Sequence, residues 1–241
     1  MDRIICGDCL ELLPQVADKC IDMILCDLPY GLTKNKWDEI IPLDELWKQY
    51  NRIIKDNGAI VLTASQPFTS TLVMSNPAMF KYEWIWEKNK AGNFLNAKKQ
   101  PLKVHENVLV FAKGQTVYNP QFWYSTPYKR WNTQKAVDKQ TNYNQHKCNV
   151  VKSEDGRRYP LSTIKVNRHE RPIHPTQKPL GLFEYLIKTY TNEGEVVLDN
   201  CIGVGTTAVA AKNTSRHFIG MEIDKKYCRD AEERLNEEHT V

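Results

Sequence analysis

The sequence lacks a long hydrophobic run. Of its 241 residues 41% are hydrophobic, yet no apolar stretch approaches the roughly 20 residues that would span a bilayer. Nor does its start, Met1-Asp2-Arg3 followed by a short apolar run, have the profile of a secretory signal peptide. We therefore expect a cytoplasmic protein without a membrane partner. A chain of this length and hydrophobic content can bury one sizeable core, which excludes a disordered or fibrous protein.

The sequence also lacks a regular cysteine framework and a strong excess of one charge. Its seven cysteines are an odd number, and they are spread through apparent strands and helices, as at Cys6, Cys26, Cys201 and Cys228. Such a distribution implies neither a set of disulfides nor a zinc site, so we expect reduced, mostly structural cysteines and no bound metal. The formal net charge of +4 does not by itself indicate a nucleic-acid partner.

Strand-like and helix-like segments alternate at both ends of the chain, a pattern typical of an α/β fold whose mostly parallel sheet is covered by helices on both faces. Predicted strands cover residues 4–6, 21–26, 59–63, 82–86, 104–112, 196–198 and 218–221. Predicted helices cover residues 10–16, 43–55 and 179–191, and two more begin at Thr206 and Lys225. The polar, lysine-rich segment between residues 86 and 104 is expected to be a mobile loop.

The alternation fades between residues 114 and 171, where aliphatic residues are few. We therefore predict one domain, formed by residues 1–113 and 172–241, with an inserted region at 114–171. Basic residues of this region are interleaved with tryptophan and tyrosine, a composition that suits phosphate contacts and base readout, although a solvated surface loop is the alternative. The basic residues predicted to contact nucleic acid are Lys129, Arg130, Arg157, Arg158 and Arg168.

A glycine-rich turn lies near the end of the chain. The segment Asp199-Asn200-Cys201-Ile202-Gly203-Val204-Gly205-Thr206-Thr207 follows an apolar strand and opens a helix, a context in which a ligand can approach the backbone closely. The next strand ends about 20 residues on, at Glu222, whose carboxylate could accept hydrogen bonds from both hydroxyls of a ribose. Together they indicate an adenosine-containing cofactor. By themselves they separate neither a nicotinamide cofactor from S-adenosylmethionine nor a ligand site from a simple tight turn.

The position of this turn distinguishes between the two cofactors. A dinucleotide-binding half needs several strands after its glycine turn, whereas one predicted strand and one helix remain here before Val241. The missing strands must come from the start of the chain, with residues 4–8 beside the strand that ends at Glu222. The fold is then circularly permuted, which disfavours a nicotinamide-dependent dehydrogenase.

Asp27-Leu28-Pro29-Tyr30 follows a buried strand directly, at the edge of the sheet where open α/β folds bind ligands. The Asp27 carboxylate and the Leu28 carbonyl could each accept one hydrogen bond from an amino group, which would make its nitrogen nucleophilic. Pro29 would keep that carbonyl aimed, and Tyr30 offers a flat face for stacking. The alternative is an ordinary proline-containing turn after a strand.

Three segments resemble motifs of amino-group DNA methyltransferases. The tetrapeptide at Asp27 is similar to D-P-P-Y, with Leu28 in place of the first proline. The segment from Asp199 to Thr207 resembles D-P-F-x-G-x-G-T-T but departs from it at Asn200 and Cys201. His174-Pro175-Thr176-Gln177-Lys178-Pro179 matches H-P-T-Q-K-P. Their order along the chain resembles the beta class, which implies a circularly permuted Rossmann-like methyltransferase fold with an inserted recognition region.

The resemblance implies S-adenosylmethionine as the cofactor and assigns residues to it. Asp199 would hold the methionine amino group, Glu222 the ribose and Asp8 the adenine amino group, although an aspartate after a strand often only caps a helix. The cofactor-binding residues implied in this way are Asp8, Cys9, Asp27, His174, Thr176, Gln177, Lys178, Asp199, Cys201, Gly203, Gly205, Thr206, Thr207 and Glu222. Those that would act on the target base are Asp27, Leu28, Pro29 and Tyr30.

The implied activity is methyl transfer to the amino group of a flipped-out DNA base. The Pro-Cys dipeptide expected of a cytosine-C5 enzyme is absent. Asp27 favours adenine N6 over cytosine N4, whose enzymes more often carry serine there. Methylation of RNA or of a protein glutamine is a further alternative, which the basic insertion and the aspartate disfavour. The intact site disfavours a DNA-binding module without activity. DNA is the expected partner, and the resemblance leaves a homodimer and a cognate restriction endonuclease open.

Overall fold

The computed structural model describes residues 2–31, 38–131, 150–167 and 177–237. They form two compact units, one of Met1–Asn119 with Ser162–Val241 and one of Pro120–Leu161. The second unit is shorter than the predicted inserted region. The chain before it is tied to the first unit, because the Val117 amide donates to the Asn57 carbonyl and the Asn119 amide to the Thr189 carbonyl.

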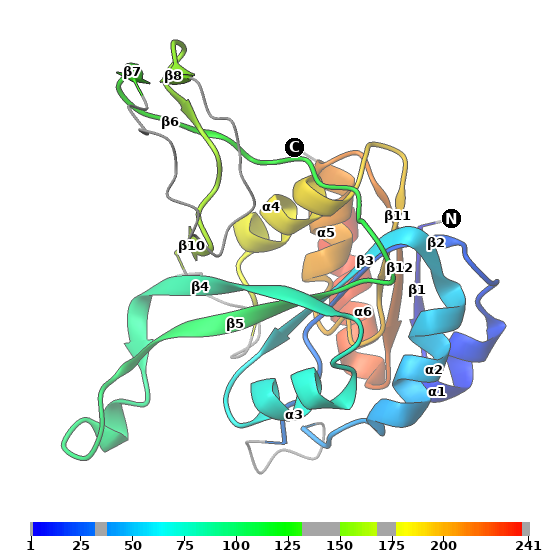
Figure 1. Cartoon of the computed structure of the whole chain (residues 1–241). Coiled ribbons are helices and arrows are strands. Elements are labelled where there is room, and N and C mark those ends of the chain that lie inside the picture. Colours follow the sequence, from blue (N-terminus) through cyan, green and yellow to red (C-terminus); the bar gives the residue numbers. More distant parts are fainter. Residues whose placement is uncertain (1, 32–37, 132–149, 168–176, 238–241) are drawn as a thin grey trace. The chain divides into compact units, whose positions relative to one another are not determined.

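An eight-stranded sheet is the centre of the first unit (Figure 1). Its strands, in spatial order, are β1 (Arg3–Cys6), β12 (His217–Glu222), β11 (Val196–Asp199), β2 (Ile21–Cys26), β3 (Ile54–Ala64), β5 (Lys103–Phe111), β4 (Phe80–Gly92) and β10 (Thr163–Lys165). Every neighbouring pair is parallel except the two that involve β5. The mostly parallel α/β fold predicted from the sequence is therefore confirmed.

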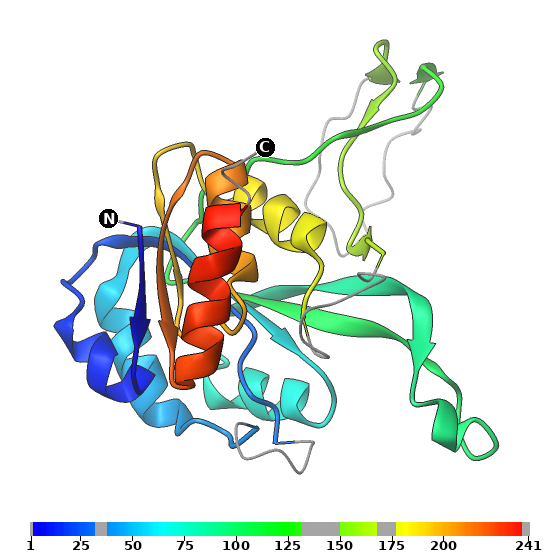
Figure 2. The same ribbon diagram turned by 180° about the vertical axis from the view of Figure 1, so that it is seen from behind.

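Helices cover both faces of the sheet (Figures 1 and 2). One face carries α1 (Cys9–Leu12) with the 3-10 helix η1 (Leu13–Gln15), α2 (Leu43–Ile53) and α3 (Phe68–Ser75), and the other carries α4 (Leu180–Tyr190), α5 (Thr206–Asn213) and α6 (Lys225–Glu237). Side chains alternate between the two cores along β2, since Ile24 and Cys26 pack with the first set and Met23 and Leu25 with the second. The sheet is therefore buried on both faces, as parallel sheets generally are.

The predicted permutation is confirmed by the pairing of β1 with β12. The two strands are parallel, with Cys6 opposite Glu222, and the Gly7 amide donates to the Glu222 carbonyl at 2.8 Å. The start of the chain therefore completes a sheet that its last strands begin, and residues 4–8 continue the half that contains the glycine turn.

Two segments differ most from the prediction. The helix expected to reach Lys55 ends at Ile53, and β3 begins at Ile54, because Ile54 pairs with Ile21 and the Lys55 ammonium pairs with the Asp22 carboxylate at 2.6 Å. The lysine-rich segment expected to be a loop is instead strand at both of its ends, since β4 runs to Gly92 and pairs there with Lys103. Hydrogen bonds between the two backbones stabilise this hairpin, although its sequence has no alternating apolar pattern.

The second unit contains two small antiparallel sheets. One pairs β6 (Trp123–Tyr124) with β9 (Arg157–Arg158), and the other pairs β7 (Tyr128–Trp131) with β8 (Val150–Ser153). Cations lie over rings, with the Arg157 guanidinium 4.6 Å from the Phe122 ring centroid and that of Arg158 4.4 Å from the Tyr128 centroid. These cation–ring pairs and the two short sheets stabilise the second unit, which has few aliphatic residues.

Cysteines of the described part of the chain are all free, including Cys6 and Cys9, which are separated by two residues after the end of β1. The described residues hold no group of three or more His, Cys, Asp or Glu side chains that could bind a metal ion. Within those same residues, none of the helices is both long and apolar enough to cross a membrane.

Gly58 tests the packing of β3 against β2. A Cβ atom at this position would lie 2.8 Å from the Asp22 carbonyl oxygen and 2.7 Å from the Ile54 side chain. We expect Gly58→Ala to lower the free energy of unfolding by about 1–3 kcal/mol, because backbone must shift to admit the methyl group. Urea unfolding measures this, with Gly114→Ala as the control, since its Cβ would lie 3.8 Å from its nearest neighbour. Equal stability of the two variants would contradict the packing described.

Candidate active site

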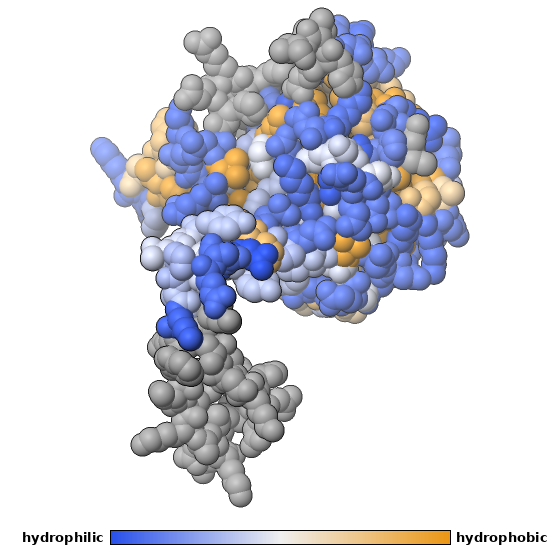
Figure 3. All heavy atoms as spheres, turned by 90° about the horizontal axis from the view of Figure 1, so that it is seen from above, coloured by the Kyte–Doolittle hydropathy of each residue, from blue (hydrophilic) through white to orange (hydrophobic). Residues whose placement is uncertain are grey.

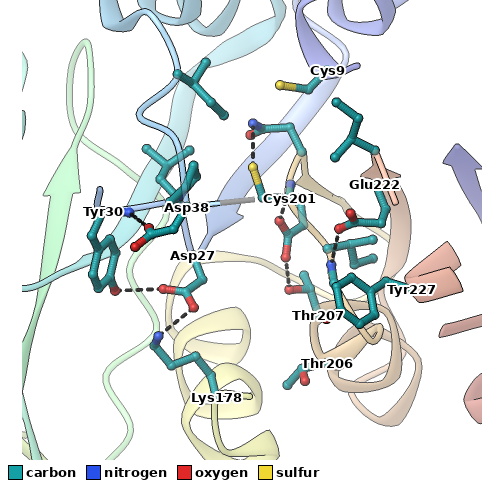
Figure 4. A pocket seen from close by; sticks show the side chains of 18 of the residues that line it. Cys9, Asp27, Tyr30, Asp38, Lys178, Cys201, Thr206, Thr207, Glu222 and Tyr227 are labelled. Carbon is teal, nitrogen blue, oxygen red and sulfur yellow. Dashed lines mark hydrogen bonds and ion pairs between the residues drawn. The ribbon is translucent and has the colours of Figure 1, made fainter. Parts of the chain in front are cut away.

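A cavity of about 670 Å³ opens at the carboxyl ends of the parallel strands, a volume usual for small-molecule sites. Its wall includes most residues predicted for the target base and the cofactor (Figure 4). They are Asp8, Cys9, Asp27, Leu28, Pro29, Tyr30, Gln177, Lys178, Asp199, Cys201, Gly203, Thr206, Thr207 and Glu222. Segments far apart in the sequence thus meet in one site.

Three further predicted cofactor residues are His174, Thr176 and Gly205. His174 and Thr176 lie outside the described residues. Gly205 lies behind the cavity wall, as the N-cap of α5, with a φ of 80°. An added Cβ at Gly205 would lie 3.0 Å from the Ala231 Cβ, so glycine is required here for a left-handed backbone and for close packing of α5 on α6.

Asp199 is a buried carboxylate at one end of the cavity. It ends β11 and is 2% exposed; its Oδ1 accepts from the Cys201 amide at 3.0 Å and its Oδ2 accepts from the Thr207 hydroxyl. Burial raises its pKa to about 6, because these neutral donors do not fully replace water around the negative charge. A cationic group in the cavity would stabilise the ionised form, so this end fits an ammonium group of a ligand.

Glu222 supplies the second carboxylate of the cavity. Its Oε2 accepts from the Gly203 amide and its Oε1 from the Asp224 amide, each at 2.9 Å, and burial raises its pKa. Each oxygen keeps a further lone pair, so the carboxylate can accept from two ligand hydroxyls. Gly203 has a φ of 53° and no atom within 4 Å of an added Cβ, which leaves its backbone open to a ligand.

Asp8 caps a helix and also lines the cavity, so it is placed for both of the roles considered from the sequence. Its Oδ1 accepts from the Leu10 amide at 2.8 Å and caps α1, while the residue also lines the cavity. Capping uses one oxygen, so the second remains an acceptor for a ligand amino group.

The departures from the family motif at Asn200 and Cys201 are accommodated by a polar cluster. Asn200 is buried and its Oδ1 accepts a hydrogen bond from the Tyr50 hydroxyl. The Cys201 thiol contacts those of Cys9 and Cys26. Hydrogen bonding to Cys26 raises the pKa of Cys201, and burial raises that of Cys26 to about 12. The three remain neutral thiols that fill the space between α1, β2 and the glycine turn.

Asp27 lies at the other end of the cavity with both carboxylate oxygens engaged (Figure 4). Its Oδ1 accepts from the Tyr30 hydroxyl at 2.7 Å and from the Thr63 hydroxyl, and its Oδ2 accepts from the Lys178 ammonium at 2.6 Å. The Tyr30 ring stacks on Phe68, with centroids 5.4 Å apart. Asp27 is therefore held in one orientation from three sides.

The turn after Asp27 is fixed by Asp38. Its Oδ1 accepts from the Tyr30 amide at 2.8 Å and from the Gly31 amide at 2.9 Å, which ties the backbone of the tetrapeptide to a buried carboxylate. Residues 32–37, which connect Gly31 to Asp38, lie outside the described residues.

Buried charges of alternating sign extend from Asp27. The Lys178 ammonium, 8% exposed, lies 2.6 Å from Asp27 and 3.4 Å from Glu106 Oε2, while Glu106 Oε1 contacts the Lys88 ammonium. Although burial opposes both shifts, the carboxylates raise the pKa of Lys178 and the ammonium groups lower that of Glu106. Lys178 and Glu106 are therefore held in their charged forms.

Sequence reasoning missed part of this arrangement. Lys178 was predicted as a cofactor residue, yet its ammonium group forms an ion pair with the Asp27 carboxylate. Thr63, Lys88 and Glu106 were not assigned a role from the sequence. Thr63 could have been found as the polar residue near the end of a buried strand beside the one that ends at Asp27.

The predicted DNA contacts are distributed in the second unit. Lys129, Arg157 and Arg158 belong to it, whereas the side chain of Arg130 and the whole of Arg168 lie outside what the structure describes. Arg158 donates to the Thr126 carbonyl at 2.5 Å, so part of its charge stabilises the unit itself. Side-chain exposure of Arg157 is 53%, which leaves it accessible.

The bond from Tyr50 to Asn200 gives a stability prediction. Because both side chains are buried, Tyr50→Phe leaves the Asn200 carbonyl without this donor. We expect the free energy of unfolding to fall by about 1–3 kcal/mol in urea. Tyr159→Phe, at a ring that is 71% exposed, is the control and should change it by less than about 0.5 kcal/mol. An unchanged stability of Tyr50→Phe would show that water or another donor replaces the hydroxyl.

Comparison with known proteins places the chain in a family. Residues 21–233 match a family model described as DNA methylase. The chain is 28% identical over 250 residues to the DNA adenine methyltransferase YhdJ of Escherichia coli strain K12, covering 97% of this chain and 82% of that protein.

Solved structures agree in fold. The M1.HpyAVI complex with S-adenosylmethionine has a TM-score of 0.66 and 26% identity, covering 98% of this chain and 100% of that one. The cytosine-N4-specific PvuII DNA methyltransferase has a TM-score of 0.70 at 16% identity, over 98% and 86% of the two chains, and shows the shared fold alone. The chain belongs to the amino-group DNA methyltransferases, a family that uses S-adenosylmethionine.

Proposed function

We propose that this DNA methyltransferase transfers the methyl group to N6 of adenine. The observation that carries the proposal is the placement of Asp27, an aspartate where cytosine-N4 enzymes more often carry serine, at the end of β2 in the cavity wall. Similarity to a protein named as a DNA adenine methyltransferase supports it. Cytosine N4 is the alternative, because the same arrangement can polarise any exocyclic amino group.

The chemistry of the amino group rests on two acceptors. One Asp27 oxygen and the Leu28 carbonyl each accept one hydrogen of the amino group, so the nitrogen lone pair is withdrawn from the aromatic ring and becomes nucleophilic. Pro29 restricts the backbone after that carbonyl. Asp27 then stabilises the positive charge that develops on the nitrogen as the methyl group is transferred.

An amino group that bonds to Asp27 Oδ1 must change the bonds that this oxygen makes here. The Tyr30 hydroxyl and the Thr63 hydroxyl both donate to Oδ1, so the amino group takes the place of one of these donors. Exchange of one donor for another costs little net free energy. We infer that Tyr30 leaves Asp27 and stacks on the flipped-out base, where stacking is worth roughly 1–3 kcal/mol. Lys178 holds Oδ2 and so keeps Oδ1 directed at the amino group.

The other end of the cavity binds and orients the donor. S-adenosylmethionine supplies a methyl group already activated on sulfonium, so the chain has only to align donor and acceptor, without a covalent enzyme intermediate. Asp199 accepts from the amino group of the methionine moiety, Glu222 from the ribose hydroxyls and Asp8 from the adenine amino group. The open backbone at Gly203 allows the close approach that this binding mode needs.

The inserted region is proposed to contact DNA. Its residues 114–171 contain Lys129, Arg130, Arg157 and Arg158, and Arg168 lies near its end. The cation and ring pairs of the second unit suit contacts to phosphates and bases. A homodimer, a cognate restriction endonuclease and a cytoplasmic location stay predictions.

Nucleoside analysis tests the proposed activity. DNA without prior methylation is incubated with the enzyme and labelled S-adenosylmethionine, hydrolysed and separated. We expect the label in N6-methyladenine, and Asp27→Ala should lower the rate by about 10²–10³-fold because a preorganised acceptor is lost. Asp44→Ala, at an exposed position of α2, is the control with unchanged rate. Label found only in N4-methylcytosine, or full activity of Asp27→Ala, would refute the proposal.

The pKa of Asp199 predicts how cofactor affinity depends on pH. Because burial raises this pKa to about 6, the carboxyl group is protonated below that pH and no longer attracts the amino group of the methionine moiety. Calorimetric titration from pH 7 to pH 5 should show affinity falling toward tenfold per pH unit below about 6. Asp199→Asn should bind weakly with no such dependence.

Folding does not confound this titration. A pKa raised in the folded state favours the protonated native form, so the contribution of Asp199 to stability is full below its ordinary pKa of 3.8 and is lost as the pH rises from there to about 6. The folded chain therefore gains stability from this group, and does not lose it, as the pH falls from 7 to 5. A wild-type affinity that stays constant from pH 7 to pH 5 would contradict the assignment of Asp199 to the amino group.

A further inference from the structure

The hairpin formed by the outer parts of β4 and β5 extends away from the rest of the first unit (Figures 1 and 2). We call residues 88–105 the arm. Its strands pair from Glu87 with His105 out to Gly92 with Lys103, and its tip contains the 3-10 helix η2 (Phe94–Asn96). No residue of the arm belongs to either of the two hydrophobic core clusters, which lie over the sheet.

The tip of the arm exposes two adjacent large apolar side chains. Phe94 is 75% exposed and Leu95 84% exposed. Figure 3 shows apolar side chains among hydrophilic ones where the arm projects. Exposed apolar pairs on a projecting element are costly in water and usually mark a contact surface.

The charge of the arm is of one sign. Lys90, Lys98 and Lys99 are exposed, and residues 88–105 contain neither aspartate nor glutamate. A second copy of the chain would bring the same cations to the same tip, so charge disfavours self-association there. A polyanion is the complementary partner, and phosphates of DNA are the polyanion that this family acts on.

The arm starts at the target-base end of the cavity. Lys88, on β4, and Glu106, on β5, both line the cavity beside Asp27, and Lys103 donates to Ser65, which lines it too. From Lys88 to Phe94 an extended chain covers about 20 Å at roughly 3.3 Å per residue. This reach matches about six base pairs, so DNA that delivers a base to Asp27 passes within range of the tip.

We propose that the arm is a DNA-contact element, separate from the inserted region, that binds duplex DNA beside the target base. Lys90, Lys98 and Lys99 neutralise phosphates, and Phe94 and Leu95 enter a groove and pack against a base step as an apolar wedge. Wedges of this kind partly unstack neighbouring bases, which lowers the cost of extruding the target base. The proposal rests on DNA as the substrate and holds for adenine or cytosine.

Equilibrium binding to a labelled duplex of random sequence tests the arm, because it requires no knowledge of the recognition site. The affinity of the full chain is measured at several salt concentrations without cofactor. Lys98→Gln with Lys99→Gln should lower the salt slope by about 2, near 0.9 for each lost phosphate contact. Phe94→Ala with Leu95→Ala should weaken binding about tenfold and leave the salt slope unchanged.

Matched controls come from the same unit. Lys48→Gln, on α2, removes an exposed lysine away from the arm, and Met74→Ala, on α3, removes a side chain that is 72% exposed. Both should bind DNA as the wild type does. All variants should bind S-adenosylmethionine with unchanged affinity, which shows that they are folded.

Two results would overturn the proposal. One is a DNA affinity and a salt slope of the arm variants equal to those of the wild type. The other is sedimentation showing that Phe94→Ala with Leu95→Ala converts a dimer to a monomer while DNA affinity per subunit is kept, because the tip would then bind a second copy. A failure of the adenine proposal would appear instead in the methylated nucleoside, with these binding results unchanged.

Discussion

Parallel pairing of β2 with β11 is the constraint on which the site depends. Leu198 lies opposite Ile24, so the strands end side by side, and Asp199 and Asp27 follow at the same edge of the sheet. The next pairs, β11 with β12 and β12 with β1, bring Glu222 and Asp8 to that edge. Four acidic residues, two near each end of the chain, thus line one cavity. Permutation changes the order of the segments and leaves their spatial arrangement intact.

The cost of burying charge explains how the two ends of the cavity differ. Around Asp27 the buried charges compensate one another: Asp27 pairs with Lys178, Lys178 with Glu106, and Glu106 with Lys88. Buried charges of this kind are stable only while each has a partner of opposite sign. Around Asp199 only neutral groups donate, and burial raises its pKa. One end is therefore complete in the protein alone and the other is completed by its ligand. That difference fits the proposed reaction, in which the base takes the place of a donor on Asp27 Oδ1 and the cofactor brings a cationic amino group to Asp199.

Much of this could be predicted because it depends on local pattern. Strand ends identify Asp27, Asp199 and Glu222, and the small number of strands after Gly203 requires β1 to pair with β12. Contacts that depend on packing could not be predicted. Lys178 reaches Asp27 across 151 positions of sequence, and no periodicity encodes that distance. The arm was missed because its strands have a partner on one side and solvent on both faces, so apolar alternation is absent. The Asn200 and Tyr50 pair likewise appears only when α2 packs beside the glycine turn.

The central claim is that Asp27 and the Leu28 carbonyl receive the amino group that is methylated. A crystal structure of the chain with duplex DNA and an unreactive analogue of S-adenosylmethionine would test it most directly. The account predicts an extruded adenine whose N6 lies about 2.7–3.2 Å from one Asp27 oxygen and from the Leu28 carbonyl oxygen, with the Tyr30 hydroxyl no longer on Asp27. An amino group bound elsewhere, while Asp27 keeps its bonds to Tyr30, Thr63 and Lys178, would contradict it.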